Sequence, residues 1–182
     1  MEKKEIRKLV FARRKEMSQQ ELEEKSKKIC ETVIGMKEFR EASAIYVYMD
    51  YNGEAMTGDL IREAWKQGKK VAAPKVEGSE MSYYYISSYE DVKPGYFSIP
   101  EPEPVNPACD EDALLIVPGV AFDDMRHRCG YGKGFYDRYL SSHREHPTIA
   151  IALEMQMMEE VPSDVHDICP MYLVTEDRVI SG

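Results

Sequence analysis

The chain has 182 residues, of which 24 are basic and 33 acidic, so its formal net charge at pH 7 is −9. A chain of this length buries on the order of 70% of its unfolded surface, enough for a core without a metal or a disulfide, so we expect one domain over residues 1–182. An acidic surface repels nucleic acid backbones and anionic lipid. Bulk charge therefore argues against nucleic acid and membranes as partners, and any anion must be bound locally.

The cysteines and the N-terminal segment carry no metal, redox or targeting signal. Cys30, Cys109, Cys129 and Cys169 are too far apart in sequence for a zinc knuckle or a redox pair, so we expect free thiols. The first residues are charged, and no segment is apolar enough for a signal peptide or a membrane span. We expect a cytoplasmic protein that acts as a monomer.

Two amphipathic helices are predicted at the start of the chain. Apolar residues at helical spacing predict the first helix over residues 3–17. Ser18 and Glu21 have the spacing of a capping box, which predicts the start of a second helix. Gly35 is placed to end that helix with a positive φ.

After residue 43 the pattern changes to short apolar segments separated by helices. We predict strands at 44–49, 71–75, 113–117 and 148–153, a helix between the first two that ends at Gly68, and a helix that begins near Phe135. Strand, helix and strand within about thirty residues form a right-handed βαβ unit with parallel strands. Two such units predict an α/β sheet with helices on both faces. Further strands are expected at 81–87 and 171–175, and a loop at the proline-rich 100–107.

The segment after strand 113–117 predicts a phosphate site, because sites in open α/β sheets lie at the carboxyl ends of the strands. Gly130, Gly132 and Gly134 alternate directly before the predicted helix. Such glycines let backbone amides turn toward one point, and a helix start adds its own free amides and positive dipole end. The alternative interpretation is an ordinary turn between a strand and a helix.

Positive charge gathers in two segments of this acidic chain. Residues 126–138 hold four basic side chains and one acidic one, and residues 1–15 hold seven basic and two acidic ones. If the two segments meet, they form a focused site for a polyanion; taken alone, the N-terminal segment reads as a solvated helix face. Asp137, the single acid of the second segment, is a candidate Mg²⁺ ligand, since Mg²⁺ bound with phosphates takes only one or two protein carboxylates.

Neither common phosphate-binding motif is present. A Walker A loop would need a glycine where His127 stands and a hydroxyl residue where Gly134 stands, and the dinucleotide fingerprint would need a glycine where Phe135 stands. The residues therefore predict a nucleotide or phosphate site of another type and do not define a reaction.

Several segments, in this order along the chain, resemble a known family: Gly53-Glu54 with Thr57, Glu101-Pro102, 117–123, Arg128, 130–138, and Gln156 with Pro162 and His166-Asp167. They look like those of the 5-formyltetrahydrofolate cyclo-ligases, also called methenyltetrahydrofolate synthetases. The resemblance implies a three-layer αβα fold with a mostly parallel, Rossmann-like sheet. It also implies an ATP- and Mg²⁺-dependent conversion of 5-formyltetrahydrofolate to 5,10-methenyltetrahydrofolate through a phosphorylated formyl group, an imidate phosphate, with release of ADP and phosphate.

The resemblance also implies roles for individual residues. The nucleotide-binding residues would be Lys4, Glu5, Ile6, Arg7, Lys8, Arg128, Cys129, Gly130, Tyr131, Gly132, Lys133, Gly134, Phe135, Tyr136 and Asp137. Lys133, Tyr136 and Arg138 would be catalytic, and Asp137 would bind Mg²⁺. The folate side would comprise Asp50, Tyr51, Glu54 and Ala55. The alternative is a non-catalytic folate- or nucleotide-binding protein of the same fold.

Three positions depart from the family's usual residues, namely Met56, Arg126 and Cys129, and we expect Arg126 to reshape the approach to the nucleotide. The pair His143 and His146 is expected on the surface past a helix end, and His166-Asp167 is expected to be structural rather than a catalytic dyad.

Overall fold

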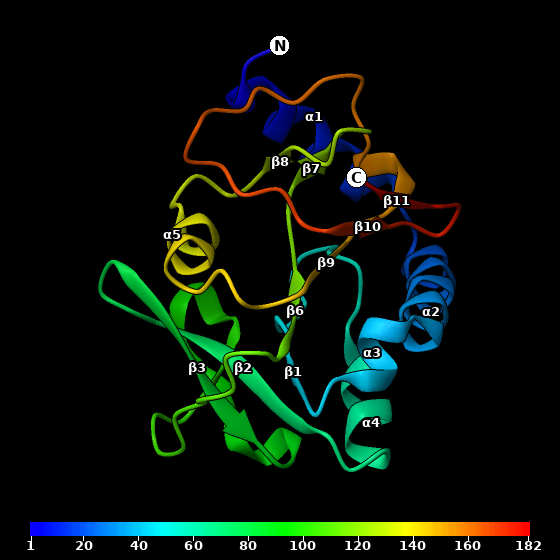
Figure 1. Ribbon diagram of the computed structural model, residues 1–182. Helices are drawn as coiled ribbons and strands as arrows, with labels where there is room; N and C mark the ends of the chain where they lie inside the picture. The colour runs from blue at the N-terminus through cyan, green and yellow to red at the C-terminus, as the bar shows by residue number, and fades with distance from the viewer.

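A central sheet of seven strands organises the computed structural model, which describes residues 1–182 (Figure 1). Its spatial order is β11-β10-β9-β6-β1-β2-β3. Adjacent strands from β10 to β2 run parallel, and only the edge strands β3 and β11 are antiparallel to their neighbours. The bounds are β1 Ala44–Tyr46, β2 Lys70–Glu77, β3 Glu80–Ile86, β6 Leu114–Val117, β9 Thr148–Ile151, β10 Tyr172–Val174 and β11 Val179–Ser181. The predicted mostly parallel sheet is confirmed.

Helices cover both faces of this sheet, as predicted. One face packs against α2 (Gln19–Gly35), α3 (Lys37–Glu41) and α4 (Gly58–Lys66), and the other packs against α5 (Phe135–Ser142). Successive strand residues point to opposite faces. Ile45 and Leu114 therefore join the larger core with α2 to α4, whereas Tyr46 and Leu115 join the core under α5. The three-layer αβα fold is confirmed.

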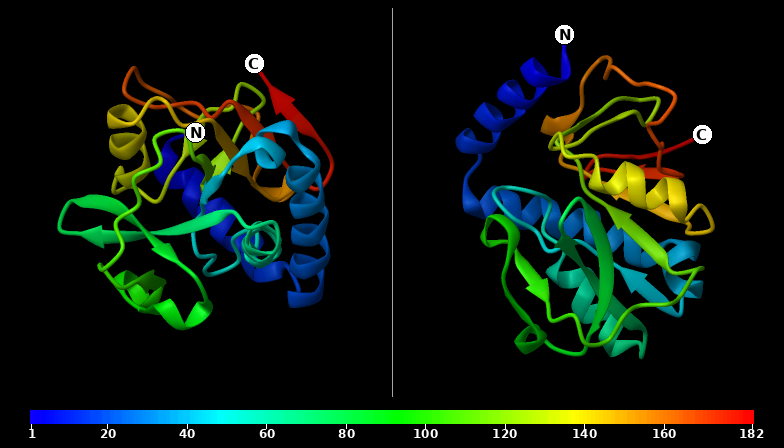
Figure 2. Two further views of the ribbon diagram at one scale, coloured as in Figure 1. Left: turned by 60° about the horizontal axis from the view of Figure 1, so that its bottom comes forward. Right: turned by 90° about the vertical axis from the view of Figure 1, so that its left-hand side faces the viewer.

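Helix α1 (Lys3–Glu16) lies outside these three layers. Its buried residues Ile6 and Val10 pack against the hairpin of β7 (Ala121–Phe122) and β8 (Arg128–Cys129), together with Val161. Figures 1 and 2 show α1 beyond the end of the sheet toward which β6 runs. The basic N-terminal helix is thus held beside the segment that follows β6.

The chain order of the strands reverses direction between β1 and β6. From β1 the chain builds outward through β2 to β3, and from β6 it builds the other way through β9 to β11. In open α/β sheets this reversal leaves a crevice outside the carboxyl ends of the two strands, where ligands bind. The loops after β1 and β6 flank that crevice.

Helix α2 differs from the prediction at its end. Ser18 accepts a hydrogen bond from the backbone N–H of Glu21 at 3.1 Å, as predicted, but the Glu21 carboxylate pairs with Lys25 at 2.8 Å. Gly35 has no positive φ and remains helical. The helix ends instead at Met36, in an extended conformation, because α3 starts directly afterwards.

The proline-rich segment, predicted to be a loop, is partly a strand. β5 (Pro100–Pro102) pairs antiparallel with β4 (Val92–Pro94) in a small separate sheet, and Pro107 forms a bridge with Tyr84. Proline is tolerated in such short edge strands because it need not donate to a neighbour. The turns η1 (Tyr89–Asp91) and η2 (Tyr96–Ser98) flank β4, and η3 (Glu154–Gln156) follows β9. Residues 89–102 therefore form a compact strap beside β2.

His146 was expected on the surface, and that prediction is wrong. The residue is 6% exposed, its Nδ1 lies 2.9 Å from the carbonyl oxygen of Ala113, and its ring packs against Tyr46 and Tyr139. Burial lowers its pKa. The turn that contains it leads directly into β9, so the ring enters the core, whereas His143 stays exposed and stacks on Tyr139.

The cysteines are unpaired, as expected. None of the helices has the length and apolar character needed to cross a bilayer.

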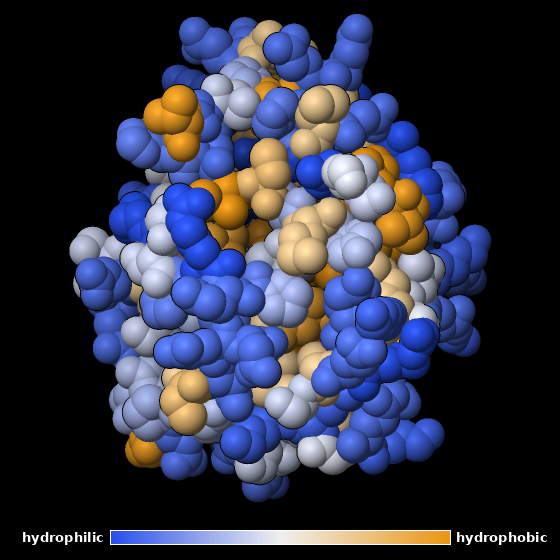
Figure 3. Space-filling model, in the orientation of Figure 1, coloured by the Kyte–Doolittle hydropathy of each residue, from blue (hydrophilic) through white to orange (hydrophobic).

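On the face seen in Figure 1 the surface is mostly hydrophilic, with apolar residues gathered in a band along its middle (Figure 3).

Candidate active site

A cavity of about 610 Å³ lies at the carboxyl ends of β1 and β6. This volume falls within the usual range for small-molecule sites. Its walls come from α1, the loop after β1, the ends of β2 and β3, the strap and the segment 128–137. The lining residues are Lys3, Arg7, Phe11, Tyr48, Met49, Tyr51, Asn52, Glu54, Pro74, Val76, Met81, Tyr96, Phe97, Ile99, Glu101, Pro118, Arg128, Gly130, Tyr131, Gly132, Lys133, Gly134, Phe135, Tyr136 and Asp137.

The two basic segments meet at this cavity, as predicted. Arg7 Nε on α1 donates to the carbonyl oxygen of Gly130 at 2.7 Å. Lys3 and Arg7 from α1 share the lining with Arg128 and Lys133 from the later segment. Positive charge is thereby concentrated at one cavity of a protein whose net charge is −9.

The glycine loop has the backbone geometry of an anion cradle. Gly132 and Gly134 have φ values of +104° and +71°, a region that strains other residues, whereas Gly130 does not. Gly134 is the N-cap of α5, and no side chain caps the first turn. The free backbone N–H groups of that turn, on Phe135 and Tyr136, therefore face a site with a favourable helix dipole.

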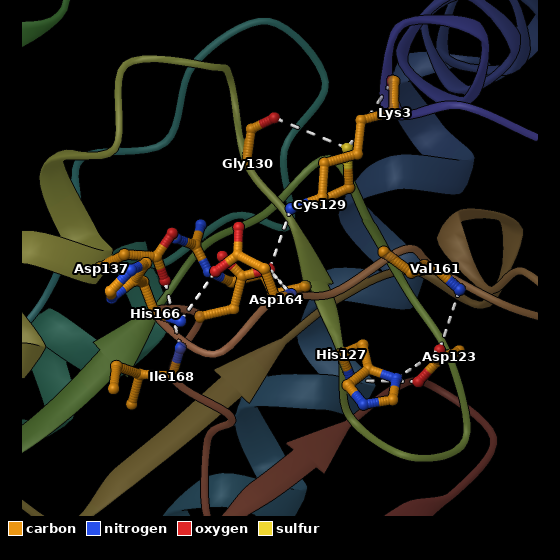
Figure 4. Close-up of polar contacts among 12 residues, drawn as sticks. Lys3, Asp123, His127, Cys129, Gly130, Asp137, Val161, Asp164, His166 and Ile168 are labelled. Carbon is orange, nitrogen blue, oxygen red and sulfur yellow. Dashed lines mark hydrogen bonds and ion pairs between the residues drawn. The ribbon is translucent and has the colours of Figure 1, made fainter.

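Asp137 lies in the first turn of α5 and lines the cavity; Figure 4 shows its contact with Ile168. Its Oδ2 lies 3.4 Å from Nη2 of Arg128, and its Oδ1 accepts a long hydrogen bond from the Ile168 N–H. Arg128 is buried, and its Nε has no hydrogen-bond partner. No group of three or more His, Cys, Asp or Glu side chains could cage a metal. The residues fit Mg²⁺ held by one carboxylate together with phosphate and water oxygens.

Glu54 is the buried carboxylate of the cavity. It is 8% exposed, and its Oε1 accepts a hydrogen bond from the Tyr51 N–H at 2.8 Å. Burial raises the pKa of Glu54 to about 7, although the charge of Arg14, the Tyr51 N–H and the Tyr131 hydroxyl each act to lower it. The carboxylate is therefore only partly ionised at neutral pH and favours a ligand that donates hydrogen bonds to it.

Apolar and aromatic side chains form the rest of the wall. Tyr96 and Phe97 come from the strap, and the Tyr96 ring meets Phe135 edge-on at a centroid distance of 6.0 Å. Tyr48, next to Glu54, is buried and donates its hydroxyl to the carbonyl oxygen of Ala55. Such surfaces accommodate flat ring systems.

Comparison with known proteins identifies the family. The profile of the 5-formyltetrahydrofolate cyclo-ligase family matches residues 1–176. The chain belongs to this family. The cyclo-ligase homologues include the 5-formyltetrahydrofolate cyclo-ligase of Escherichia coli K12, 31% identical over 76% of this chain and 80% of the relative. The probable cyclo-ligase of Schizosaccharomyces pombe is 29% identical over 99% of this chain and 98% of the relative. The structure of Aquifex aeolicus 5,10-methenyltetrahydrofolate synthetase superposes with a TM-score of 0.87 and 35% identity, covering 100% of this chain and 93% of that one.

Not all residues suggested by resemblance to the cyclo-ligases line the cavity. On α1 only Arg7 of the predicted 4–8 stretch does, because cavity residues on a helix recur every three or four positions, as Lys3, Arg7 and Phe11 do. The others are exposed or packed elsewhere: Lys4, Glu5 and Lys8 face solvent, while Ile6 and Cys129 are buried in the core between α1 and the β7–β8 hairpin.

Asp50 and Ala55 are also outside the cavity wall. Asp50 Oδ1 accepts hydrogen bonds from the N–H and the hydroxyl of Thr57, so it fixes the start of α4. Ala55 is buried in the larger core. Of the predicted folate-side residues, Tyr51 and Glu54 line the cavity.

Arg138 has a supporting position. Its guanidinium donates to the carbonyl oxygens of Lys133 at 2.7 Å and of Ser79 at 2.6 Å, and it is absent from the cavity lining. It ties the glycine loop to the turn between β2 and β3. Predicted catalytic residues Lys133 and Tyr136 do line the cavity.

Arg126 does not shape the approach to the cavity, contrary to expectation. Its φ is +64°, a left-handed conformation for which the glycine usual in cyclo-ligases is better suited. Its Nε donates to the carbonyl oxygen of Pro170. The neighbouring Asp123 accepts hydrogen bonds from Met125, His127 and Val161 and holds the hairpin together (Figure 4).

Sequence reasoning missed Phe11, Tyr96 and Phe97, which line the cavity, and Arg14, which lies on the same helix as Phe11. Their helical spacing from Arg7 could have indicated Phe11 and Arg14, because residues three or four positions apart lie on the same face of a helix. The strap residues Tyr96 and Phe97 carry none, since their place depends on the pairing of β4 with β5. Asp167, expected to be structural, binds Lys3 Nζ at 3.0 Å and so anchors the start of α1.

Proposed function

We propose that this chain catalyses the ATP- and Mg²⁺-dependent cyclisation of 5-formyltetrahydrofolate to 5,10-methenyltetrahydrofolate, with release of ADP and phosphate. The observation that carries the proposal is the content of one cavity. On one side of the cavity, a glycine-rich turn, the uncapped first turn of α5 and basic side chains suit a triphosphate. On the other side, a buried carboxylate among aromatic side chains suits a pterin. In this proposal the partners are small molecules, and the protein works as a cytoplasmic monomer without nucleic acid or membrane.

The chemistry starts at the formyl oxygen, which is a poor leaving group until it is phosphorylated. The γ-phosphorus forms a bond to this oxygen while its bond to the oxygen bridging to the β-phosphate breaks, which releases ADP and leaves an imidate phosphate. The N10 nitrogen then attacks the formyl carbon, the ring closes, and N10 loses its proton to solvent or to the phosphate oxygen; the carbon–oxygen bond then breaks to release phosphate. No protein nucleophile is required, so the protein's task is to position both substrates and to neutralise charge.

The residues of the glycine loop are suited to that task. Lys133 and the N–H groups at the start of α5 stabilise the negative charge of the transferring phosphoryl group. Arg7 and the unpartnered Nε of Arg128 supply further donors to phosphate oxygens. Asp137 would hold Mg²⁺, which neutralises phosphate charge when bound.

Glu54 is assigned to binding the folate, and Tyr136 is assigned to donating a hydrogen bond to the formyl oxygen that reacts. The Glu54 carboxylate can accept hydrogen bonds from the amino group and a ring N–H of the pterin, a bidentate arrangement that favours its ionised form. Tyr136 lies in the first turn of α5, with the guanidinium of Arg128 at 5.6 Å over its ring. Burial raises the pKa of Tyr136, so its hydroxyl stays protonated and can donate a hydrogen bond.

A spectrophotometric assay with 5-formyltetrahydrofolate, ATP and magnesium tests the proposal. The near-ultraviolet absorbance of the methenyl product should appear together with an equal amount of ADP, and only when folate and Mg²⁺ are both present. Binding of folate without either product would show a non-catalytic binding protein. Equal ATP hydrolysis with and without folate would refute both assignments.

A further inference from the structure

Arg14 in the last turn of α1 has a buried guanidinium that the proposed reaction does not use. The residue is 8% exposed. Its Nη1 donates to the Tyr131 hydroxyl at 2.9 Å and more weakly to the Asn52 carbonyl oxygen at 3.4 Å. Its stem packs so closely on Gly53 that a β-carbon there would lie 3.3 Å from Cδ of Arg14. Three segments meet at this side chain: α1, the loop after β1 and the glycine loop.

The charge of Arg14 is poorly compensated where it lies. Nε and Nη2 have no hydrogen-bond partner, and Nη1 donates only to neutral oxygens. The guanidinium lies 5.5 Å from the ring centroid of Phe11 and 5.7 Å from that of Tyr131, which offsets part of the cost of burial. A neutral side chain of similar volume would fill the same space without that cost. Packing alone therefore does not explain an arginine here.

The buried charge of Arg14 acts on Glu54. It belongs to the same loop as Asn52 and Gly53, which Arg14 contacts, and its Oε1 is held by the Tyr51 N–H. Among the influences that lower the pKa of Glu54, the charge of Arg14 is the largest, followed by the Tyr51 N–H and the Tyr131 hydroxyl.

Lys3, Arg7, Arg128 and Lys133 share the cavity wall with Glu54, but none of them is among the leading influences on its pKa. Asp50 raises the pKa of Glu54. Tyr48 and Tyr136 act on the same carboxylate, and burial raises the pKa of both, so they remain neutral. Arg14 is thus the cation with the largest effect on the ionisation of Glu54.

We propose that Arg14 is a positioning residue for the folate substrate, which holds the loop that carries Glu54 in place through its contacts with Asn52, Gly53 and Tyr131. This rests on the proposed function, in which Glu54 accepts hydrogen bonds from the pterin. Because Tyr131 belongs to the glycine loop, the same contact links the nucleotide side of the cavity to the folate side.

Three variants test this proposal in the full-length protein. Arg14→Met removes the charge and keeps the space between the rings of Phe11 and Tyr131 filled. Arg14→Lys keeps the charge but lacks the planar guanidinium group. Arg13→Met is the matched control, since the neighbouring arginine donates to the Met155 carbonyl oxygen and lies outside the cavity wall. The kcat and the KM for each substrate are measured from about pH 5.5 to about pH 8.5.

For Arg14→Met we expect the KM for folate to rise roughly tenfold at neutral pH, as loss of a buried charge near a carboxylate predicts, with the KM for ATP nearly unchanged. The acid limb of kcat/KM for folate should move to higher pH, so that the defect is largest at low pH. Arg14→Lys should restore most of the wild-type profile, and Arg13→Met should leave it in place. A purely structural role would shift neither the acid limb nor the folate KM selectively.

A wild-type profile in Arg14→Met would overturn the proposal and leave the proposed function intact. If that variant does not fold, Tyr131→Phe decides, because it removes only the hydroxyl to which Arg14 donates. A selective rise in folate KM of about threefold with the same direction of pH shift would support the proposal, and an unchanged profile would overturn it. Absence of folate turnover by the wild-type protein would instead refute the proposed function itself, before any variant is compared.

Discussion

Replacing Glu54 by glutamine should stabilise the protein at alkaline pH and not at acid pH. Glutamine keeps the shape and the oxygen that accepts from the Tyr51 N–H, and removes only the ionisable group. In the folded protein burial raises the pKa of Glu54 from its usual 4.5 to about 7. A raised pKa means that this group's stabilising contribution is fully present below pH 4.5 and is lost as the pH rises through 7.

The size of the effect follows from the same pKa. At about 1.4 kcal/mol for each pH unit between the two values, ionisation of Glu54 costs the folded protein about 3 kcal/mol by about pH 8. At about pH 5 the cost is below about 1 kcal/mol. The free energy of unfolding of Glu54→Gln, relative to wild type, should therefore rise by about 2 to 3 kcal/mol between these two pH values.

Urea unfolding at several pH values measures this difference, since all other titrating groups are common to both proteins. Glu31→Gln, which removes an exposed carboxylate from α2, serves as the control against which the pH dependence is read. A difference between Glu54→Gln and wild type that stays constant from about pH 5 to about pH 8 would refute the reasoning. It would mean that Glu54 is as well solvated in the folded protein as in the unfolded chain.

Three further variants and one control variant test the nucleotide side of the cavity. Arg7→Glu should weaken ATP binding measured by calorimetry. Lys8→Glu makes the same charge change on the exposed face of α1 and should have little effect. Equal losses of ATP affinity in both variants would show that the overall charge of α1, rather than a contact of Arg7 in the cavity, determines ATP binding. Lys133→Ala should raise the activation free energy by about 2 to 4 kcal/mol in steady-state kinetics, and a loss well below this would mean that Lys133 does not stabilise the transition state. Asp137→Asn should raise the magnesium concentration required for activity while circular dichroism shows an intact fold, and an unchanged requirement would remove Asp137 from the metal site.

The sheet was predictable because its strands are short, apolar and separated by clear helix signals. Residues such as Ile45 and Leu115 are buried on one face or the other, so local composition already reflects the layered core. The strap was not predictable. The pairing of Lys93 with Glu101 joins a segment rich in prolines, and local sequence gives no sign that this small sheet places Tyr96 at a cavity.

The candidate site was predictable where its residues are contiguous. The alternating glycines predicted a flexible turn before α5, and Gly132 and Gly134 there adopt a positive φ that few other residues tolerate. Elsewhere the family pattern points to whole segments, whereas only the side chains that point into the cavity can line it. Asp50 and Glu54 lie in one loop, yet Asp50 turns back to Thr57 and only Glu54 lines the cavity.

The position of α1 outside the three layers matters for how the protein is produced and handled. Its side chains Lys3 and Arg7 line the cavity, and Lys3 lies close to Met1 in the sequence. An acidic peptide fused directly before Met1 would lie near these two basic side chains and would compete with an anionic ligand for them. A peptide fused after Gly182 would instead follow the edge strand β11, at the opposite edge of the sheet from β3.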